Sequence, residues 1–305
     1  MISIAEDGKR RLRYAVENGR LSHVTLISGD PYVCKMLTDY AASLIFHKTE
    51  SKVCDVPDYL HFDGSELRVE SCEQMLGELN VIPTSGQRLI SIANAGKMSD
   101  IVQNMLLKTI EEPPDGNYFF LYGNERALLP TILSRCSVLT LGNLSHEDVQ
   151  NAILPLCANE SDAAYIARLG GSIETAMRLC TDEQFMKFYS DCAEYMCSVG
   201  KSTPKWEKLK ELAAYDAKTA AAVFDMVISD MQRIKLGTEP VYFTRQPENA
   251  LIRSRADSLS DKQINSLAEL LCDMHRKLSS NTPAKQTFDN FAAKTEQVIY
   301  YGRYE

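Results

Sequence analysis

The stretch LISGDPYVCKML, residues 26–37, has the layout of a phosphate-binding loop, but two of its key residues differ from the motif. That motif, G-x-x-x-x-G-K-[ST], uses glycine where the backbone approaches phosphate, lysine as a cation and a hydroxyl as a ligand for Mg²⁺. Gly29 and Lys35 fit these positions, whereas Cys34 and Met36 occupy the other two. A cysteine side chain intrudes on the phosphate cradle, and a thioether is a poor ligand for magnesium. The stretch alone leaves open whether nucleotide still binds.

A second motif of nucleotide hydrolysis is also changed. In P-loop ATPases an apolar strand ends in acidic residues that hold Mg²⁺ and align the attacking water. The matching strand here is RLISIANAGKMS, residues 88–99, in which Ala93 and Asn94 stand where the acids are expected. Because both changes fall at chemical positions and leave the flanking apolar pattern intact, we predict that the fold is kept and hydrolysis is lost. Lys35 then either binds a stray phosphate or is a solvated lysine near the start of a helix.

Size and composition are those of an ordinary globular chain. A length of 305 residues suggests about two domains, with three small ones possible. The net charge of −8 argues against a chain that grips nucleic acid alone, since phosphate neutralisation needs clustered Lys and Arg. The nine cysteines contain no C-x-x-C pair, which argues against a disulfide framework or zinc knuckle. With no evident signal peptide and no apolar run of roughly 18 residues, we expect a cytoplasmic protein without a membrane segment.

Strand and helix patterns alternate over the first 143 residues, which predicts a parallel, doubly wound sheet. Ser99 is a good helix N-cap, and Ile101, Met105 and Ile110 fall near one face of the helix that follows it. The expected strands cover residues 23–28, 59–62, 88–93, 118–122 and 137–142, and the expected helices residues 35–46, 69–81 and 99–112.

The rest of the chain has only helical patterns. Ser145 is the expected N-cap of the first of these helices, and Gly170 and Gly171 end the next. Gly, Ser and Pro make residues 200–206 the best linker candidate, and residues 237–249 predict an irregular loop. The predicted domains are residues 1–143, 144–203 and 204–305.

One long segment is specific enough to indicate a family. Residues 104–136, NMLLKTIEEPPDGNYFFLYGNERALLPTILSRC, resemble the central signature of the clamp-loader AAA+ subunits. Residues 15–29 resemble the entry of that family into its first strand, and residues 278–294 resemble part of its collar helices. The resemblance implies a P-loop-type AAA+ domain with a parallel sheet, followed by an all-α lid and an all-α collar that mediates oligomerisation.

Within this family the chain resembles the subunits that do not hydrolyse ATP. Active subunits carry a sensor-2 arginine in the motif G-S-x-R-x-A, whereas GSIETA, residues 171–176, has Glu174 at that position. A carboxylate there repels a triphosphate, so we expect no nucleotide cofactor and no ATPase activity. Many relatives also carry a four-cysteine zinc module after the phosphate-loop helix. Only Cys54 stands in the corresponding segment, so we expect no metal.

The resemblance assigns one chemical role to this chain. The arginine of the S-R-C motif, here Arg135, is expected to reach the γ-phosphate of ATP held by a neighbouring subunit and to stabilise the transferred charge. The alternative is an arginine paired with a local carboxylate. Asn124 is either at the sensor-1 position or a strand cap, and the basic residues 9–13 are either a solvated helix face or a contact to the DNA backbone.

The resemblance also implies partners. These are the gamma/tau and delta subunits of a hetero-pentameric clamp loader of DNA polymerase III, with the sliding clamp and primer-template DNA reached through the complex. The chain is then expected to help load the clamp during DNA replication. Two alternatives stay open: an AAA+ subunit that binds and hydrolyses ATP despite its altered loop, and an AAA+-derived adaptor in an unrelated complex.

Overall fold

The structure, a computed structural model, describes residues 3–123, 125–199, 206–280 and 282–301. The chain divides into two compact units, the first comprising Met1–Ala152 and Ser172–Glu174, the second Ile153–Gly171 and Thr175–Glu305. The three-domain division expected from the sequence stays a prediction. Most of its proposed linker, residues 200–206, lies outside the described residues.

A five-stranded parallel sheet forms the centre of the first unit, as the alternating pattern predicts. The strand order is β2-β3-β4-β1-β5, so the first strand lies between the fourth and the fifth. Every residue of β3 is buried, because helices cover both faces of the sheet. The strands are β1 (Val24–Ser28), β2 (Tyr59–Asp63), β3 (Arg88–Ala93), β4 (Asn117–Tyr122) and β5 (Ser137–Thr140).

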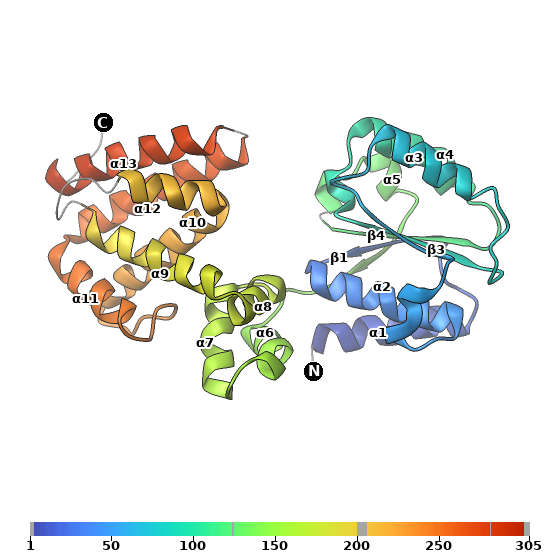
Figure 1. Cartoon of the computed structure of the whole chain (residues 1–305), viewed down its shortest axis with the longest axis horizontal. Coiled ribbons are helices and arrows are strands. Elements are labelled where there is room, and N and C mark those ends of the chain that lie inside the picture. Colours follow the sequence, from blue (N-terminus) through green and yellow to red (C-terminus); the bar gives the residue numbers. More distant parts are fainter. Residues whose placement is uncertain (1–2, 124, 200–205, 281, 302–305) are drawn as a thin grey trace. The chain divides into compact units, whose positions relative to one another are not determined.

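The helices of this unit lie in two layers. Helices α1 and α2 cover one face of the sheet, and α3, α4 and α5 cover the other (Figure 1). Their bounds are α1 (Ser3–Glu17), α2 (Pro31–Phe46), α3 (Val69–Glu78), α4 (Asp100–Glu111) and α5 (Pro130–Leu133). Short 3₁₀ turns connect some of them, namely η1 (Glu50–Asp55), η2 (Ala95–Lys97) and η3 (Glu125–Ala127). Helix α6 (His146–Ile153) follows β5, and the Ser145 hydroxyl accepts from the Asp148 N–H, which confirms the predicted cap.

Helix α4 begins as predicted but is rotated relative to the expected face. The Ser99 hydroxyl accepts from the Val102 N–H, which confirms the N-cap. Ile101, however, is 64% exposed, and the buried side chains include Val102, Leu106 and Ile110. The prediction that Ile101, Met105 and Ile110 fall near one face is therefore wrong for Ile101, whereas Ile110 is buried and Met105 packs against the core. Positions four apart line one side of a helix, and Ile101 lies about 100° away from the line that begins at Val102.

The second unit is helical in its described residues. It contains η4 (Leu154–Leu156), α7 (Glu160–Gly170), most of α8 (Ile173–Thr181), α9 (Glu183–Ser198), α10 (Trp206–Lys235), α11 (Glu248–Ser258), α12 (Asp261–Ser279) and α13 (Ala284–Tyr301). Helix α10 is central and contacts α9, α11, α12 and α13. Phe224 of α10 stacks on Phe291 at 5.7 Å between ring centroids and also contacts Tyr195 and Phe288. No helix in the described part of the chain is long and apolar enough to cross a membrane.

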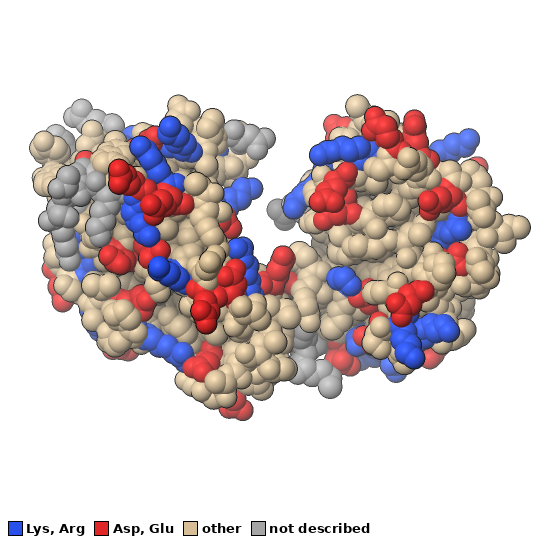
Figure 2. Space-filling model, viewed as in Figure 1, with Lys and Arg blue, Asp and Glu red and all other residues tan. Residues whose placement is uncertain are grey.

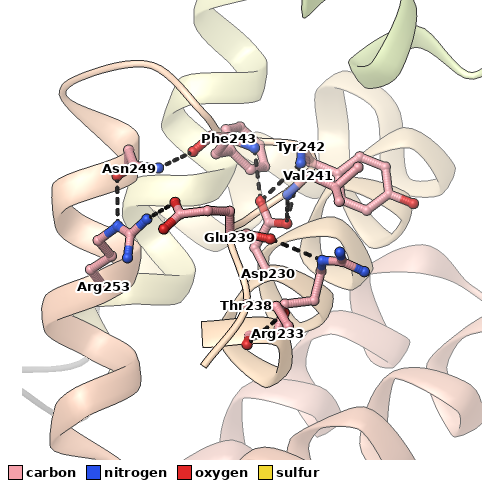
Figure 3. A network of polar contacts seen from close by, with 9 residues as sticks. All are labelled: Asp230, Arg233, Thr238, Glu239, Val241, Tyr242, Phe243, Asn249 and Arg253. Carbon is pink, nitrogen blue, oxygen red and sulfur yellow. Dashed lines mark hydrogen bonds and ion pairs between the residues drawn. The ribbon is translucent and has the colours of Figure 1, made fainter. Parts of the chain in front are cut away.

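A buried carboxylate organises the irregular connection between α10 and α11, as Figure 3 shows. Asp230 of α10 is fully buried, and its two oxygens accept hydrogen bonds from the backbone N–H groups of Val241, Tyr242 and Phe243 at 2.7–3.2 Å. The irregular loop that the sequence predicts at residues 237–249 is thus held by α10 itself. The loop backbone has no sheet or helix partner here, so the carboxylate supplies the acceptors that buried amides require.

We expect Asp230→Ala to lower the free energy of unfolding by roughly 2–4 kcal/mol, because three backbone N–H groups lose a charged acceptor. Glu239→Gln is the matched control, because Glu239 is an exposed acid that pairs with Arg253 beside the same loop. Its effect should stay within about 0.5 kcal/mol. Urea denaturation measures both values, and limited proteolysis reports opening of residues 237–247. Equal stability of the two variants would contradict the role of Asp230.

Candidate functional site

Helix α2 begins within the segment whose backbone N–H groups a phosphate-binding loop would need to keep free. The sequence predicts a helix from residue 35, but the observed helix starts at Pro31, four residues earlier. Asp30 is its N-cap, and one carboxylate oxygen accepts from the N–H groups of Tyr32 and Val33 at 3.0 and 3.3 Å. The Cys34 N–H bonds to the Asp30 carbonyl at 2.9 Å. The amides that cradle phosphate in a working loop are therefore used inside the helix.

The two motif residues nearest this junction have structural roles. Cys34 is fully buried, its thiol lies 3.6 Å from the Ile27 carbonyl oxygen, and burial raises its pKa to about 12. Gly29 remains necessary for packing, because a Cβ at this position would lie 2.8 Å from the Cβ of Leu141. Cys34 thus fills space between α2 and β1. Gly29 allows the chain after β5 to pass close to the end of β1.

Lys35 is paired within its own helix. Its ammonium lies 2.6 Å from one oxygen of Asp39, and the other oxygen of Asp39 accepts from the Tyr59 hydroxyl at 2.7 Å. Burial is the largest of the causes that raise the pKa of Tyr59, so the phenol stays a hydrogen-bond donor. Met36 is half-buried one residue further along. The lysine of the motif thus serves a local ion pair, although half of its side chain remains exposed.

The position of the lost acidic motif is occupied by a backbone turn. Ala93 ends β3, and Asn94 follows in the left-handed conformation at φ 50° and ψ 36°. The Asn94 amide donates to Asp63 at 3.0 Å, and Asp63 also accepts from the backbone and side chain of Ser65. The Ser65 hydroxyl bond is the main cause that lowers the pKa of Asp63. The hydrogen bonds of the Asp63 carboxylate therefore stabilise this turn.

A pocket of about 280 Å³ remains at the carboxyl ends of the strands, where open α/β sheets bind ligands. Its lining includes Lys35, Asn94 and Glu174, the last from the short segment that belongs to the same compact unit. The residues at the lysine of the phosphate loop, at the acidic motif (Ala93 and Asn94) and at the sensor-2 position therefore line one pocket. They bring together an ion-paired lysine, an amide and a carboxylate.

Arg135 lies apart from that pocket's lining residues, between α5 and β5. Its guanidinium contacts Glu111 at 2.6 Å and donates to the Thr131 carbonyl at 2.8 Å and to the Ser134 hydroxyl at 3.1 Å. The side chains of Arg135 and Glu111 are 37% and 45% exposed. The next residue, Cys136, is half-buried against the core, and burial raises its pKa to about 11. The arginine is therefore a surface cation with a local carboxylate partner.

A buried amide positions the segment that carries Arg135. Gln103 of α4 is 1% exposed, and its side-chain oxygen accepts from the Leu129 N–H at 2.8 Å, directly before Pro130 begins α5. Its amide nitrogen donates to the Met98 carbonyl at 3.1 Å. Gln103 thus ties the entry of α5 to α4, whose last residue is Glu111.

Sequence reasoning missed three of these features. Asp30-Pro31 is a recognisable helix start, because Asp favours the N-cap and Pro the first helical position. Gln103 and Glu111 carried no local signal, since their partners are distant in sequence. Asn124, the sensor-1 candidate, lies outside the described residues.

The basic residues near the N-terminus have local partners. Lys9 pairs with Glu50, Arg10 and Arg11 pair with Asp7, and Arg13 donates to the Tyr40 hydroxyl. On the face shown in Figure 2, acidic and basic side chains are interspersed over each unit. Within the described ranges no group of three or more His, Cys, Asp or Glu side chains is arranged to hold a metal ion. The expected absence of a zinc module stays a prediction.

Comparison with known proteins finds relatives among the subunits of DNA polymerase III. The pattern of the family described as "DNA polymerase III, delta subunit" matches residues 4–145. The DNA polymerase III subunit delta' of Escherichia coli (strain K12) is 26% identical over 225 residues, which are 71% of this chain and 65% of that protein. The match thus spans slightly less than two thirds of that relative's length. The gamma subunit of Buchnera aphidicola is 29% identical over 152 residues, which are 49% of this chain and 37% of that protein.

Among solved structures, a DNA polymerase III gamma subunit-related protein from Thermotoga maritima aligns over 94% of this chain and 98% of its own, with 18% identity and a TM-score of 0.48. The parallel five-stranded sheet and the helical segments that follow it confirm the fold class predicted from the sequence. The chain is thus similar to delta and delta' subunits of DNA polymerase III, over residues 4–145 in the family pattern and over 225 residues in the Escherichia coli protein.

The double substitution Cys34→Gly and Met36→Ser restores the consensus sequence of the phosphate-binding loop. We expect that it does not create Mg²⁺-dependent ATP binding. Helix α2 still begins at Pro31, and Asp30 still occupies its first amides. Titration with a fluorescent ATP analogue, with and without Mg²⁺, measures the result against the unchanged chain. A melting curve controls for folding, because a glycine inside a helix costs about 1 kcal/mol. Micromolar Mg²⁺-dependent binding by either protein would contradict this account.

Proposed function

We propose that the chain is a non-hydrolysing delta'-type subunit of a clamp loader and that it helps to load the sliding clamp during DNA replication. The start of α2 at Pro31, under the Asp30 cap, carries this proposal, because it removes the phosphate cradle while the sheet remains intact. The similarity to DNA polymerase III delta' subunits supports this assembly. In it the chain contributes subunit contacts and one cation, while neighbouring gamma/tau subunits hold and hydrolyse ATP.

Arg135 is the proposed cation. Its exposure on the surface supports a role toward a neighbouring chain, and its bond to Glu111 is of a kind that is readily exchanged. Exposed ion pairs contribute typically less than about 1 kcal/mol, whereas an arginine and a phosphate form charge-assisted, often bidentate hydrogen bonds. On assembly, the γ-phosphate of ATP in the adjacent subunit replaces Glu111. The guanidinium then stabilises the charge that develops on the transferred phosphoryl group.

We expect Arg135→Ala to slow ATP hydrolysis at the adjacent site by about 10³-fold or more, the range of arginine fingers elsewhere. Glu111→Ala is the matched control, because it removes the local partner and leaves the cation. It should keep the rate or raise it slightly. Hydrolysis by the reconstituted complex is measured after gel filtration has verified assembly of both variants. An unchanged rate in Arg135→Ala removes the finger, and an equal loss in Glu111→Ala favours the purely local ion pair.

The proposed partners are the gamma/tau and delta subunits in a hetero-pentamer. The helices from α10 to α13 form the proposed collar, through which this chain packs against the collars of its neighbours. The sliding clamp and primer-template DNA are reached through the complex. The local pairing of the basic residues 9–13 supports this indirect contact with DNA.

When the purified chain is mixed with gamma/tau and delta subunits, we expect one complex containing all three components, because the proposed function gives this chain the delta' position in the ring. Analytical gel filtration with subunit quantification measures it, and the Arg135→Ala and Glu111→Ala proteins serve as controls that should still assemble. Failure of the unchanged chain to join would favour the alternative of an AAA+-derived adaptor in another complex. The other alternative, an ATPase, is tested by the nucleotide titration of the isolated chain.

A further inference from the structure

Two cysteines meet in the helical segment after α6. The sulfur atoms of Cys157 and Cys180 lie 3.4 Å apart, and both side chains are half-buried. Both residues belong to the second compact unit. Cys54 and Cys272 are exposed at other places, and Cys34, Cys72, Cys192 and Cys197 are buried.

The two thiols lie at the ends of local elements, where small adjustments are possible. Cys157 follows η4 in an extended conformation, with φ −102° and ψ 155°. Cys180 is in the last turn of α8. A disulfide bond is about 2.05 Å long, so the sulfurs must approach each other by about 1.3 Å. Side-chain rotation and the loop at Cys157 supply such a movement without unfolding α8.

We propose that Cys157 and Cys180 are a modification site, a dithiol pair that low-molecular-weight disulfides oxidise reversibly to an intramolecular disulfide. The bond closes a loop that contains α7, the turn at Gly171 and α8. It therefore links the residue before α7 covalently to the last turn of α8. The site is independent of the proposed role of Arg135.

The chemistry balances with a small disulfide as the oxidant. The Cys157 thiolate attacks the oxidant, forms a mixed disulfide and releases one small thiolate. Cys180 then loses its proton, attacks the Cys157 sulfur and releases the second small thiolate, which leaves a protein disulfide and two small thiols. Burial and the contact with Cys157 raise the pKa of Cys180 to about 12, so this thiol is protonated at neutral pH. Oxidation is consequently slow at neutral pH and faster at higher pH.

The test uses the full chain under native conditions. The reduced protein is incubated with oxidised glutathione, blocked with N-ethylmaleimide at low pH and digested with trypsin. The expected product is a linked pair of peptides, residues 136–168 and 179–187, that loses two hydrogen atoms in mass and separates after reduction. Both thiols of the pair become inaccessible to the blocking reagent, and the thermal midpoint of the oxidised protein rises above that of the reduced protein.

Variants locate the bond and control for other cysteines. The Cys136→Ser protein should keep the link, which excludes the second cysteine of the same tryptic peptide, and Cys272→Ser should keep it too. Cys157→Ser and Cys180→Ser should each abolish the link and the change in midpoint. The proposal is overturned if native protein carries glutathione at Cys54 or Cys272 without any link between the two peptides. A link that forms only in urea also overturns it. The digest of the unchanged chain decides both points even if a variant fails to fold.

Discussion

The carboxylate of Asp30 accepts the first two free N–H groups of α2, and Pro31 fixes the backbone at the first helical position. A helix N-terminus attracts anions because its amides point outward and its dipole is positive there. Here the anion is part of the chain. An internal carboxylate is always present at this position, whereas a nucleotide must be bound from solution, so the cap competes with any phosphate for these two amides. The Cys34 N–H is likewise used inside the helix, where it bonds to the Asp30 carbonyl.

The predicted site residues lie in two separate regions of the first unit. Lys35, Asn94 and Glu174 line the pocket at the strand ends, whereas Arg135 lies at the surface after α5. Gln103 holds the entry of α5, and Glu111 holds Arg135 at the surface. The anchoring amide is buried and the ion pair is exposed, so the backbone that carries the arginine is fixed more firmly than its side chain. Such an arrangement suits a group that exchanges its partner on assembly.

Much of the first unit could be predicted from local patterns. The strands of the parallel sheet, the caps at Ser99 and Ser145 and the loop after α10 are encoded by nearest neighbours in the sequence. The early start of α2 was also encoded, in Asp30-Pro31, but the motif frame centred on Lys35 led to a later start. The face of α4 was misread, because apolar residues continue around this helix and only the tertiary fold decides that Ile101 is exposed. The partners of Gln103, Arg135 and Asp230 are set by the fold, which periodicity does not describe.

Gly29 of the altered loop is needed for packing at the end of β1. Gly29 allows the chain after β5 to pass close to the end of β1, and the Leu141 N–H bonds to the Ser28 carbonyl at 2.8 Å. Strand β5 begins two residues after Arg135 and pairs with β1 along its length. The pairing of β5 with β1 therefore links the position of Arg135 to the strand end that leads into α2. A side chain at residue 34 is accommodated within the core beside α2, whereas a side chain at residue 29 would collide with Leu141 just after β5.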